Sequence, residues 1–271
     1  MILVTFVSLC LNFLQGDLLM KKVRYEEMMP HEVVKARTEK PVAYLPIGGI
    51  EWHGEHNPLG LDTVKGHELC IKAAQKGGGL SMPPLFWGES RESELLEFDY
   101  NVDGKVTEKM KLPVFTRGYM GGITPEQEHA FYEQLLTHIY YQLKSLGFRV
   151  IFVLCGHYPL KGYAVKTAQE FMQKNPEIKI YAGIEADPVR DIYPNGGDHA
   201  GKWETSIMST LRPELVDVSV LGDDKSVKPI GVYGEDPRCD DFKEFGQKVT
   251  QDIIDRMVSI TDEMLKELGL F

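Results

Sequence analysis

The sequence predicts an α/β fold in which helices cover a largely parallel sheet. Strand-like apolar runs alternate with segments whose apolar residues recur at helical spacing, as in proteins built on parallel sheets. The run 149–155 is apolar at nearly every position. We therefore expect both of its faces to be covered, as in the middle of such a sheet.

The first half of the chain contains one clear strand and one clear helix. Residues 42–47 form an apolar run that predicts a buried strand, and residues 62–75 follow as a helix. Three glycines at 77–79 end that helix. We interpret residues 80–86 as a short extended segment interrupted by two prolines.

The middle of the chain is less regular. Residues 87–117 are polar and show no steady period, so we expect an inserted loop or a small hairpin. A helix then follows Thr124, which can cap it together with Gln127, and runs to about Ser145. Its apolar residues Phe131, Leu135, Ile139 and Leu143 are expected on one face.

The second half continues the alternation of strands and helices. The strand at 149–155 is followed by a helix over about 162–174 and a strand over 178–184. A further helix ends before Pro213, and a last long helix is expected over about 242–268.

Composition favours a single domain without affinity for nucleic acid. The chain has 271 residues, 43% of them hydrophobic, which suffices for one large core. Because no shift in composition suggests a linker, we expect one domain over residues 20–271. The formal charge of -10 argues against nucleic-acid binding, which requires basic surfaces.

The first residues need a separate interpretation. Residues 1–14 are apolar like the core of a signal peptide, but they lack a basic leading segment and a small-residue cleavage site. The run is also too short to span a bilayer comfortably, and we expect no contact with a membrane. We interpret residues 1–19 as an N-terminal extension or a mis-called start before Met20, with an export signal as the alternative. Four cysteines without CxxC spacing predict reduced thiols in a cytoplasmic protein.

Acidic and imidazole side chains gather at the expected carboxyl ends of two strands. Glu51 and His53 lie two positions apart and face the same way in an extended segment, and Asp62 can return to the same point after a turn. His157 directly follows the strand at 149–155, where open parallel sheets bind ligands. Glu204, at the start of a helix, can point to the same edge. Carboxylates and imidazoles are typical ligands of zinc or manganese, so a metal centre of one or two ions is predicted.

Each of these residues also has an ordinary structural interpretation. Glu51 and His53 could form a surface pair, Asp62 could cap the helix that follows it, and His157 could be a core histidine. Taken together, their positions after two strands favour the metal interpretation. We expect neither His56 nor His67 to be a ligand, and we expect the thiol of Cys155 to be packed in the core.

The sequence resembles the creatininase family of metal-dependent amidohydrolases from about Val42 to the C-terminus. The first family signature, Glu-x-His-Gly-x-His-x-Pro and then Asp, stands at 51–58 and Asp62. A Gly-His pair after an apolar strand stands at 156–157, and His-Ala/Gly-Gly-x-x-Glu-Thr-Ser stands at 199–206. A weaker match covers residues 231–237.

The resemblance implies a three-layer α/β/α sandwich, a centre of two divalent ions (zinc, manganese or iron) and a homo-oligomer, often a hexamer. Carried over by position, Glu51, His53, Asp62 and His157 would be metal ligands, with Asp62 bridging. Glu204 would be a further ligand or a proton carrier, and His199 would act near the substrate.

These expectations combine into a hydrolase that cleaves the C–N bond of a small amide, cyclic amide or formamide with a metal-activated water. Glu204 or His199 would pass a proton to the leaving nitrogen. The residues predicted to line the substrate pocket are Tyr158, Trp203, Gly121 and Gly122, with a core position as the equal alternative for Trp203.

One departure from the family pattern leaves an alternative open. Where creatininase continues its Gly-His pair with Tyr-Glu-Asn, this chain has Tyr158 and then Pro159, which cannot bind a second metal through its side chain. The second ion would then depend on Glu204 or be weaker. The segment 87–117 also differs from the usual family segment, which commonly shapes the substrate pocket, so a substrate other than creatinine is expected. The alternative is a non-catalytic assembly or binding protein of the same fold with a degenerate metal site.

Overall fold

Four parallel strands form the centre of the molecule. The computed structural model describes residues 22–87, 105–111 and 124–270. The strand order is β2-β1-β3-β4, and each neighbouring pair is parallel. The strands are β1 (Val42–Ile47), β2 (Leu80–Ser81), β3 (Val150–Cys155) and β4 (Lys179–Gly183).

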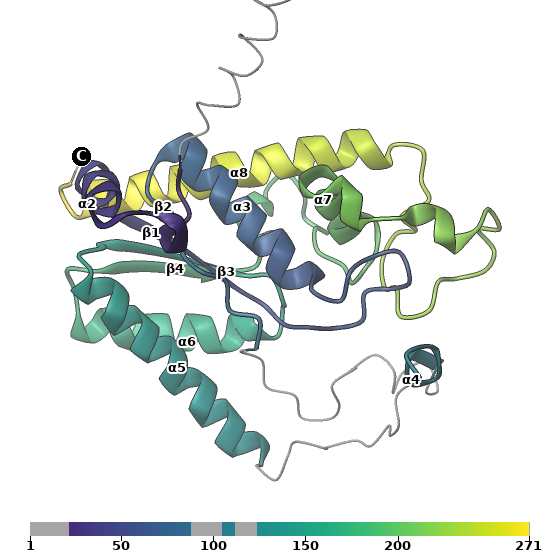
Figure 1. The fold of residues 1–271 in the computed structure, drawn as a ribbon, viewed down its shortest axis with the longest axis horizontal. Coiled ribbons are helices and arrows are strands. Elements are labelled where there is room, and N and C mark those ends of the chain that lie inside the picture. The colour runs from purple at the N-terminus through teal and green to yellow at the C-terminus, as the bar shows by residue number, and fades with distance from the viewer. Residues whose placement is uncertain (1–21, 88–104, 112–123, 271) are drawn as a thin grey trace, which may run out of the picture.

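Helices cover both faces of this sheet, as Figure 1 shows, with α3 and α8 on one side and α5 and α6 on the other. The predicted three-layer α/β/α sandwich is therefore confirmed. The α-helices are α2 (Pro30–Glu39), α3 (Leu61–Gly77), α4 (Lys105–Lys109), α5 (Pro125–Ser145), α6 (Leu160–Lys174), α7 (Lys202–Leu211) and α8 (Phe242–Glu267). Short 3-10 helices are η1 (Tyr25–Glu27), η3 (Asp187–Val189), η4 (Pro213–Leu215) and η5 (Val218–Leu221).

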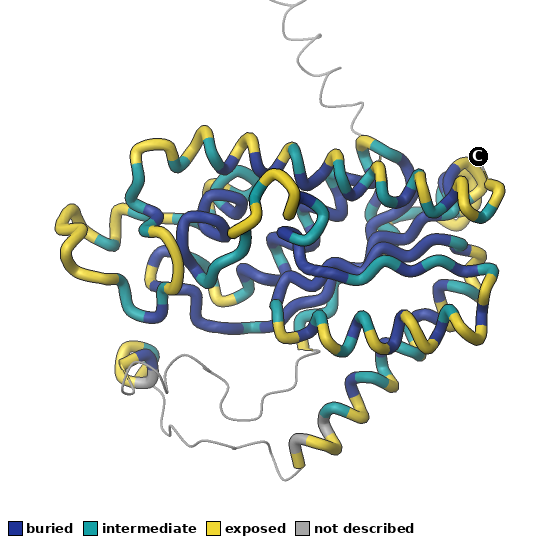
Figure 2. Tube along the Cα trace, turned by 180° about the vertical axis from the view of Figure 1, so that it is seen from behind, coloured by how far each residue is buried: buried dark blue, intermediate teal, exposed yellow. Residues whose placement is uncertain are grey.

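The two central strands are buried along their whole length. Every residue of β1 and β3 is buried, and Figure 2 shows the dark core running through the sheet and the inner faces of the helices. Strands covered on both faces need apolar side chains at every position, which explains the continuous apolar runs in the sequence. Cys155 ends β3 and is fully buried, as expected.

The strand order creates a switch point at the carboxyl ends of β1 and β3. The chain passes from β1 to β2 on one side, and β3 then returns to the opposite side of β1. Ligands of open parallel sheets bind outside the carboxyl ends of the strands at such a switch point. The segments that follow β1 and β3, which carry Glu51, His53 and His157, both begin there.

The start of α5 agrees with the prediction, and its predicted apolar face agrees except at Phe131. Thr124 accepts a hydrogen bond from the Gln127 amide, and Gln127 bonds back to the Thr124 amide, which completes the capping box. Leu143 is buried and Leu135 and Ile139 pack partly buried against the core, whereas Phe131 is 63% exposed. The other buried side chains that the structure describes in this helix are Tyr132, Leu136 and Tyr140. Tyrosines can bury their rings while keeping a polar tip, so they compete for this stripe with the residues chosen by apolarity alone.

Two other predicted segments also differ from the structure. The extended segment at 80–86 is a strand only over Leu80–Ser81, and Leu85 adds a single bridge to Ile47. Part of the loop or hairpin expected over 87–117 is the helix α4. Residues 1–19, Gly121 and Gly122 lie outside the described residues.

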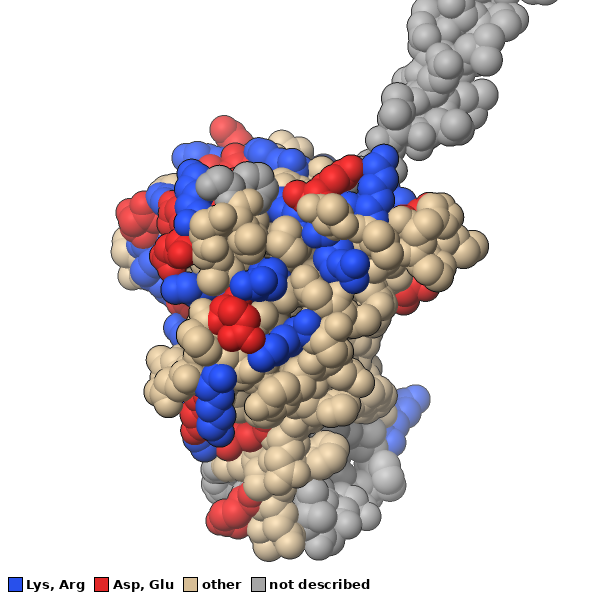
Figure 3. Space-filling model, turned by 90° about the vertical axis from the view of Figure 1, so that its left-hand side faces the viewer, with Lys and Arg blue, Asp and Glu red and all other residues tan. Residues whose placement is uncertain are grey.

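The surface at the amino ends of the strands is mixed in charge. Figure 3 views the end of the molecule where α2 and the C-terminus of α8 meet, and basic and acidic side chains alternate there with uncharged surface. Ion pairs such as Lys22–Glu32 and Lys179–Glu267 account for part of this pattern. Within the described ranges, no helix has both the length and the apolar character to cross a membrane.

Candidate metal centre

Glu51 and His53 lie on the loop that leaves β1 and returns to α3. The Glu51 amide donates to the Leu59 carbonyl, which closes this loop. The Nδ1 of His53 lies 3.2 Å from the Glu51 carbonyl, an oxygen that can only accept, so Nδ1 carries the hydrogen. The Nε2 of His53 therefore faces the site as a potential metal ligand.

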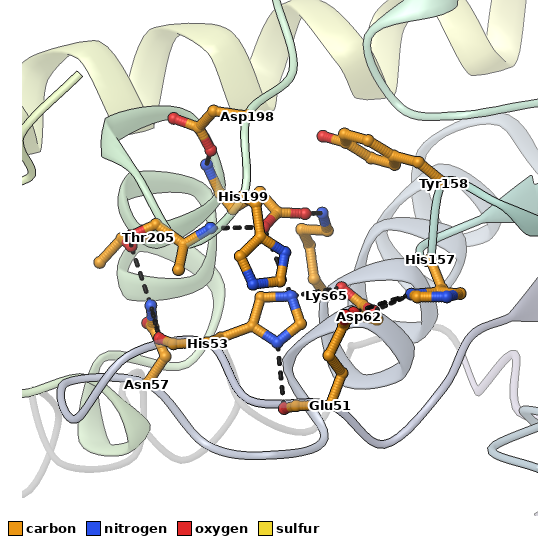
Figure 4. A network of polar contacts seen from close by, with 12 residues as sticks. Glu51, His53, Asn57, Asp62, Lys65, His157, Tyr158, Asp198, His199 and Thr205 are labelled. Carbon is orange, nitrogen blue, oxygen red and sulfur yellow. Dashed lines mark hydrogen bonds and ion pairs between the residues drawn. The ribbon is translucent and has the colours of Figure 1, made fainter. Parts of the chain in front are cut away.

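Asp62 stands in the first turn of α3, two residues after the cap position. The N-cap of this helix is Gly60, and no side chain caps the helix. Asp62 is 2% exposed and points to the two histidines of the site (Figure 4), so the alternative that it caps α3 does not hold.

A glycine allows α3 to approach the end of β3. A Cβ atom added to Gly156 would overlap the backbone carbonyl of Asp62. Because Gly156 has no side chain, the first turn of α3 reaches the residue that precedes His157. This close approach brings the Asp62 carboxylate to within 3.0 Å of the His157 Nδ1.

The two oxygens of Asp62 face different histidines. Oδ1 lies 3.0 Å from the Nε2 of His53, and Oδ2 lies 3.0 Å from the Nδ1 of His157. Glu51 completes the second contact, with its Oε2 also 3.0 Å from the His157 Nδ1. Glu51, Asp62 and His157, all buried, therefore form one triad with ligand atoms within 4.8 Å of one another.

Glu204 forms a second triad with His53 and Asp62. Its Oε2 lies 3.5 Å from the His53 Nε2, and ligand atoms of the three buried residues lie within 4.8 Å of one another. Glu204 stands in the first turn of α7, as expected for a residue that points to the sheet edge. The second triad is complete without a ligand at Pro159, whose ring lines the same cavity.

The charges of these groups suit a bound cation. Burial favours the neutral form of His53, but Asp62, Glu204 and Glu51 outweigh this effect and raise its pKa to about 9. Burial likewise opposes ionisation of Asp62, but His53 and His157 hold its pKa well below the usual range. Buried carboxylates that recruit positive charge from neighbouring imidazoles fit a divalent ion, which binds in place of the protons. Carboxylate oxygen and imidazole nitrogen also match the ligands of zinc and manganese.

A buried lysine, which the sequence did not reveal, stands behind the second triad. The ammonium of Lys65 lies 2.6 Å from the Oε1 of Glu204 and 2.9 Å from the Oε1 of Glu185. Lys65 follows Asp62 by three positions and so shares its helix face, and Glu185 follows β4 at the carboxyl edge. These two positions are the features of the sequence from which the pair could have been predicted.

Two of the residues predicted to act on the substrate line the cavity, and a third lies in the core. His199 lines the cavity beside His53, with ring centroids 4.3 Å apart, and its Nε2 lies 2.8 Å from the Trp52 carbonyl. Tyr158 also lines the cavity and donates to Glu185. Trp203 packs in the core against Tyr193 and Phe245 and is absent from the lining.

Other motif residues hold the site together. The His56 Nε2 bonds to the Ala200 carbonyl, and Asn57 donates to the hydroxyl of Thr205 on α7. These bonds clamp the loop after β1 to the start of α7. Asp198, also unassigned from the sequence, lines the cavity and accepts from the backbone amides of Trp203 and Glu204.

The comparison with protein families agrees with the motifs. A family model described as creatininase, creatinine amidohydrolase, matches residues 26–260. The chain belongs to the creatininase family. A creatinine amidohydrolase of Pseudomonas putida is 26% identical over 218 residues, which cover 72% of this chain and 75% of that protein.

Solved structures of creatininases share the fold. A creatinine amidohydrolase (creatininase) has a TM-score of 0.63 at 20% identity, covering 92% of this chain and 98% of that one. A creatininase mutant described as the Zn-Zn type has a TM-score of 0.64 at 20% identity, over 92% of this chain and 99% of that chain. A structure described as creatininase Mn gives 0.60 at 20% identity over the same shares.

Proposed function

We propose that this member of the creatininase family is a metal-dependent hydrolase of the C–N bond in a small amide, cyclic amide or formamide. The observation that carries the proposal is the shared carboxylate of Asp62, whose two oxygens face His157 in one triad and His53 in the other. The bridging role proposed for Asp62 follows from this arrangement. Carboxylates that hold two neighbouring ions are a recurrent feature of hydrolytic metal sites.

The cavity next to the triads favours a small substrate. Its volume is about 120 Å³, which is well below the roughly 300–1,000 Å³ of pockets that hold drug-sized ligands. Divalent ions held by these residues would supply Lewis acidity, which activates water and polarises a carbonyl group. A creatininase mutant of 21% identity is described as complexed with creatine, a molecule of this size class. The departures at Pro159 and in the segment 87–117 lead us to propose a substrate other than creatinine.

His199 is the residue best placed to move a proton. Because its Nε2 donates to the Trp52 carbonyl, Nδ1 is the basic nitrogen of the neutral ring. Burial, together with His53, lowers the pKa of His199, which keeps the ring neutral and able to accept. Both oxygens of Glu204 already accept hydrogen bonds, from Lys65 and from the Ala200 amide, so we assign Glu204 to metal binding.

Hydrolysis can be tested on a panel of small amides, cyclic amides and formamides, creatinine included. We expect turnover by the metal-loaded protein, and loss of both tightly bound metal and turnover in Glu51→Gln. The matched control is Glu55→Gln on the same loop, an exposed residue that pairs with Lys109. Full activity and stoichiometric metal in Glu51→Gln would remove the proposal. A well-folded protein that binds no ion under metal-replete conditions would favour the non-catalytic alternative.

The family resemblance motivates a proposal about assembly, and the cysteine pattern motivates one about location. We propose a homo-oligomer, with a hexamer as the first form to test by light scattering, and a cytoplasmic location for the reduced thiols. Cys70, Cys155 and Cys239 are free thiols in the structure.

A further inference from the structure

Lys65 forms a direct ion pair with a carboxylate of only one of the two triads. Its side chain is fully buried and forms ion pairs with Glu185 and Glu204. Glu204 belongs to the triad with His53 and Asp62, whereas neither partner belongs to the triad of Glu51, Asp62 and His157. The two triads therefore share Asp62 but differ in their contact with an ammonium group (Figure 4).

Glu185 keeps this ammonium in place. Its Oε1 accepts from Lys65, from the hydroxyl of Tyr158 at 2.7 Å and from the indole of Trp203 at 3.1 Å. These donors come from α3, from the segment after β3 and from α7. The ammonium is thus paired with two buried carboxylates and held by three elements of the fold.

The ammonium restricts what Glu204 can offer to an ion. Its Oε1 is occupied by Lys65, and its Oε2 accepts from the Ala200 amide while facing His53. Only Oε2 can reach an ion, and the neighbouring positive charge repels a cation at that position. Buried charges at such separations interact strongly because water does not screen them.

We propose that Lys65 acts as a built-in cation that weakens the site formed by His53, Asp62 and Glu204. The protein then holds one divalent ion tightly at Glu51, Asp62 and His157, and a second ion that exchanges readily. This inference rests on the metal centre of the proposed function. Within that centre, it assigns unequal affinities to the two ions and names the residue responsible.

The test is a titration of the metal-free protein with Mn²⁺, with free Mn²⁺ followed by its EPR signal. For the wild type we expect two steps, the second with a Kd at least ~10-fold above the first. In the double variant Lys65→Met/Glu185→Gln, the second step should tighten ~10-fold or more, while the first changes less than ~3-fold. Glu185 is changed together with Lys65 because a lone buried carboxylate would be left unpaired.

Two further variants complete the design. Glu204→Gln should lose the weak binding step and keep the tight one. If the double variant does not fold, this result still decides whether the weaker ion binds at the triad that contains Glu204. Lys40→Met is the matched control, because Lys40 is a buried lysine that pairs with Asp262 away from the site. Its titration should match the wild type.

The outcomes separate this inference from the proposed function. Two equally tight ions in the wild type, or an unchanged second step in the folded double variant, would overturn the role of Lys65 and leave the metal centre intact. A wild type that binds no Mn²⁺ would overturn the metal centre itself.

Discussion

Asp62 is the residue through which both halves of the proposed centre are connected. It is buried, its pKa is held well below the usual range against the effect of burial, and each of its oxygens faces a different histidine. Glu51 and Glu204 each contribute to a single triad with Asp62. Substitutions at these three carboxylates should therefore have different consequences.

Asp62→Asn should weaken the binding of both ions, because the shared negative charge is lost. We expect each affinity to fall at least ~100-fold, about 2.7 kcal/mol, whereas Glu51→Gln should remove only the tight ion. Ion counts by elemental analysis after dialysis measure the difference. Retention of both ions in folded Asp62→Asn would contradict the bridging role.

His56 should make stability depend on pH. Burial lowers its pKa from 6.5 to about 4, so the native protein keeps the ring neutral while the unfolded chain binds a proton below pH 6.5. The contribution of His56 is thus complete above pH 6.5 and is lost as the pH falls toward 4. For a shift from 6.5 to about 4, at about 1.4 kcal/mol per pKa unit, the full loss is on the order of 3.5 kcal/mol.

This dependence can be measured by urea unfolding between pH 7 and 4.5. His56→Gln should lose less stability than the wild type over this range, because the titrating ring is gone. His138→Gln, at an exposed position on α5, serves as the control and should follow the wild type. Parallel curves for the wild type and His56→Gln would contradict the effect.

At the scale of elements, the site depends on how closely α3 approaches the end of β3. Gly156 has no space for a side chain because the backbone carbonyl of Asp62 lies against it. Gly48 makes a similar contact with Thr63 after β1. The first turn of α3 is thus wedged between the ends of the two central strands, which fixes the position of Asp62.

Gly156→Ala should therefore damage both the fold and the metal centre. We expect a loss of at least ~2 kcal/mol in the free energy of unfolding, because the methyl group displaces backbone rather than a flexible side chain. Gly162→Ala is the matched control, since no atom lies within 4 Å of its Cβ and it stands in α6. That change should stabilise by roughly 0.5 kcal/mol. Equal stability of the two variants, measured by urea unfolding, would contradict the close contact between the first turn of α3 and Gly156.

Sequence patterns predicted the central strands, which follow from local periodicity, and the site residues that stand just after the strands. The runs 42–47 and 149–155 are strands β1 and β3, and the residues just after them come together as expected. The ion pair between Lys65 and Glu185 could not be predicted, because it joins residues 120 positions apart and a lysine in a helix is usually exposed. The apolar face predicted for α5 included the exposed Phe131 and omitted the buried Tyr132, because its residues were chosen by apolarity alone.

For the whole molecule, the centre joins the carboxyl ends of the two central strands to the first turns of α3 and α7. The loop after β1, the first turns of α3 and α7 and the residue after β3 each supply a ligand candidate. An ion bound there would cross-link these elements. Metal binding should therefore contribute to global stability as well as to catalysis.

Removal of metal with a chelator should lower the thermal midpoint. An ion at 100 times its Kd adds about 2.7 kcal/mol, which corresponds to a shift of roughly 5–10 °C for a chain of this size. Zn²⁺ or Mn²⁺ should restore the midpoint, and Mg²⁺ should do so less well, because it prefers oxygen ligands and retains its water. A midpoint indifferent to chelation and to added Zn²⁺ would contradict a structural contribution of the ions.

The most direct measurement is an anomalous-scattering map from crystals grown with Mn²⁺ or Zn²⁺, recorded at the absorption edge of the metal. We predict a strong peak among Glu51, Asp62 and His157, and a weaker peak among His53, Asp62 and Glu204. Both should lie within bonding distance of the Asp62 carboxylate, roughly 2.0–2.2 Å for a zinc–oxygen bond. A map in which every peak lies away from Asp62 would contradict the shared metal centre.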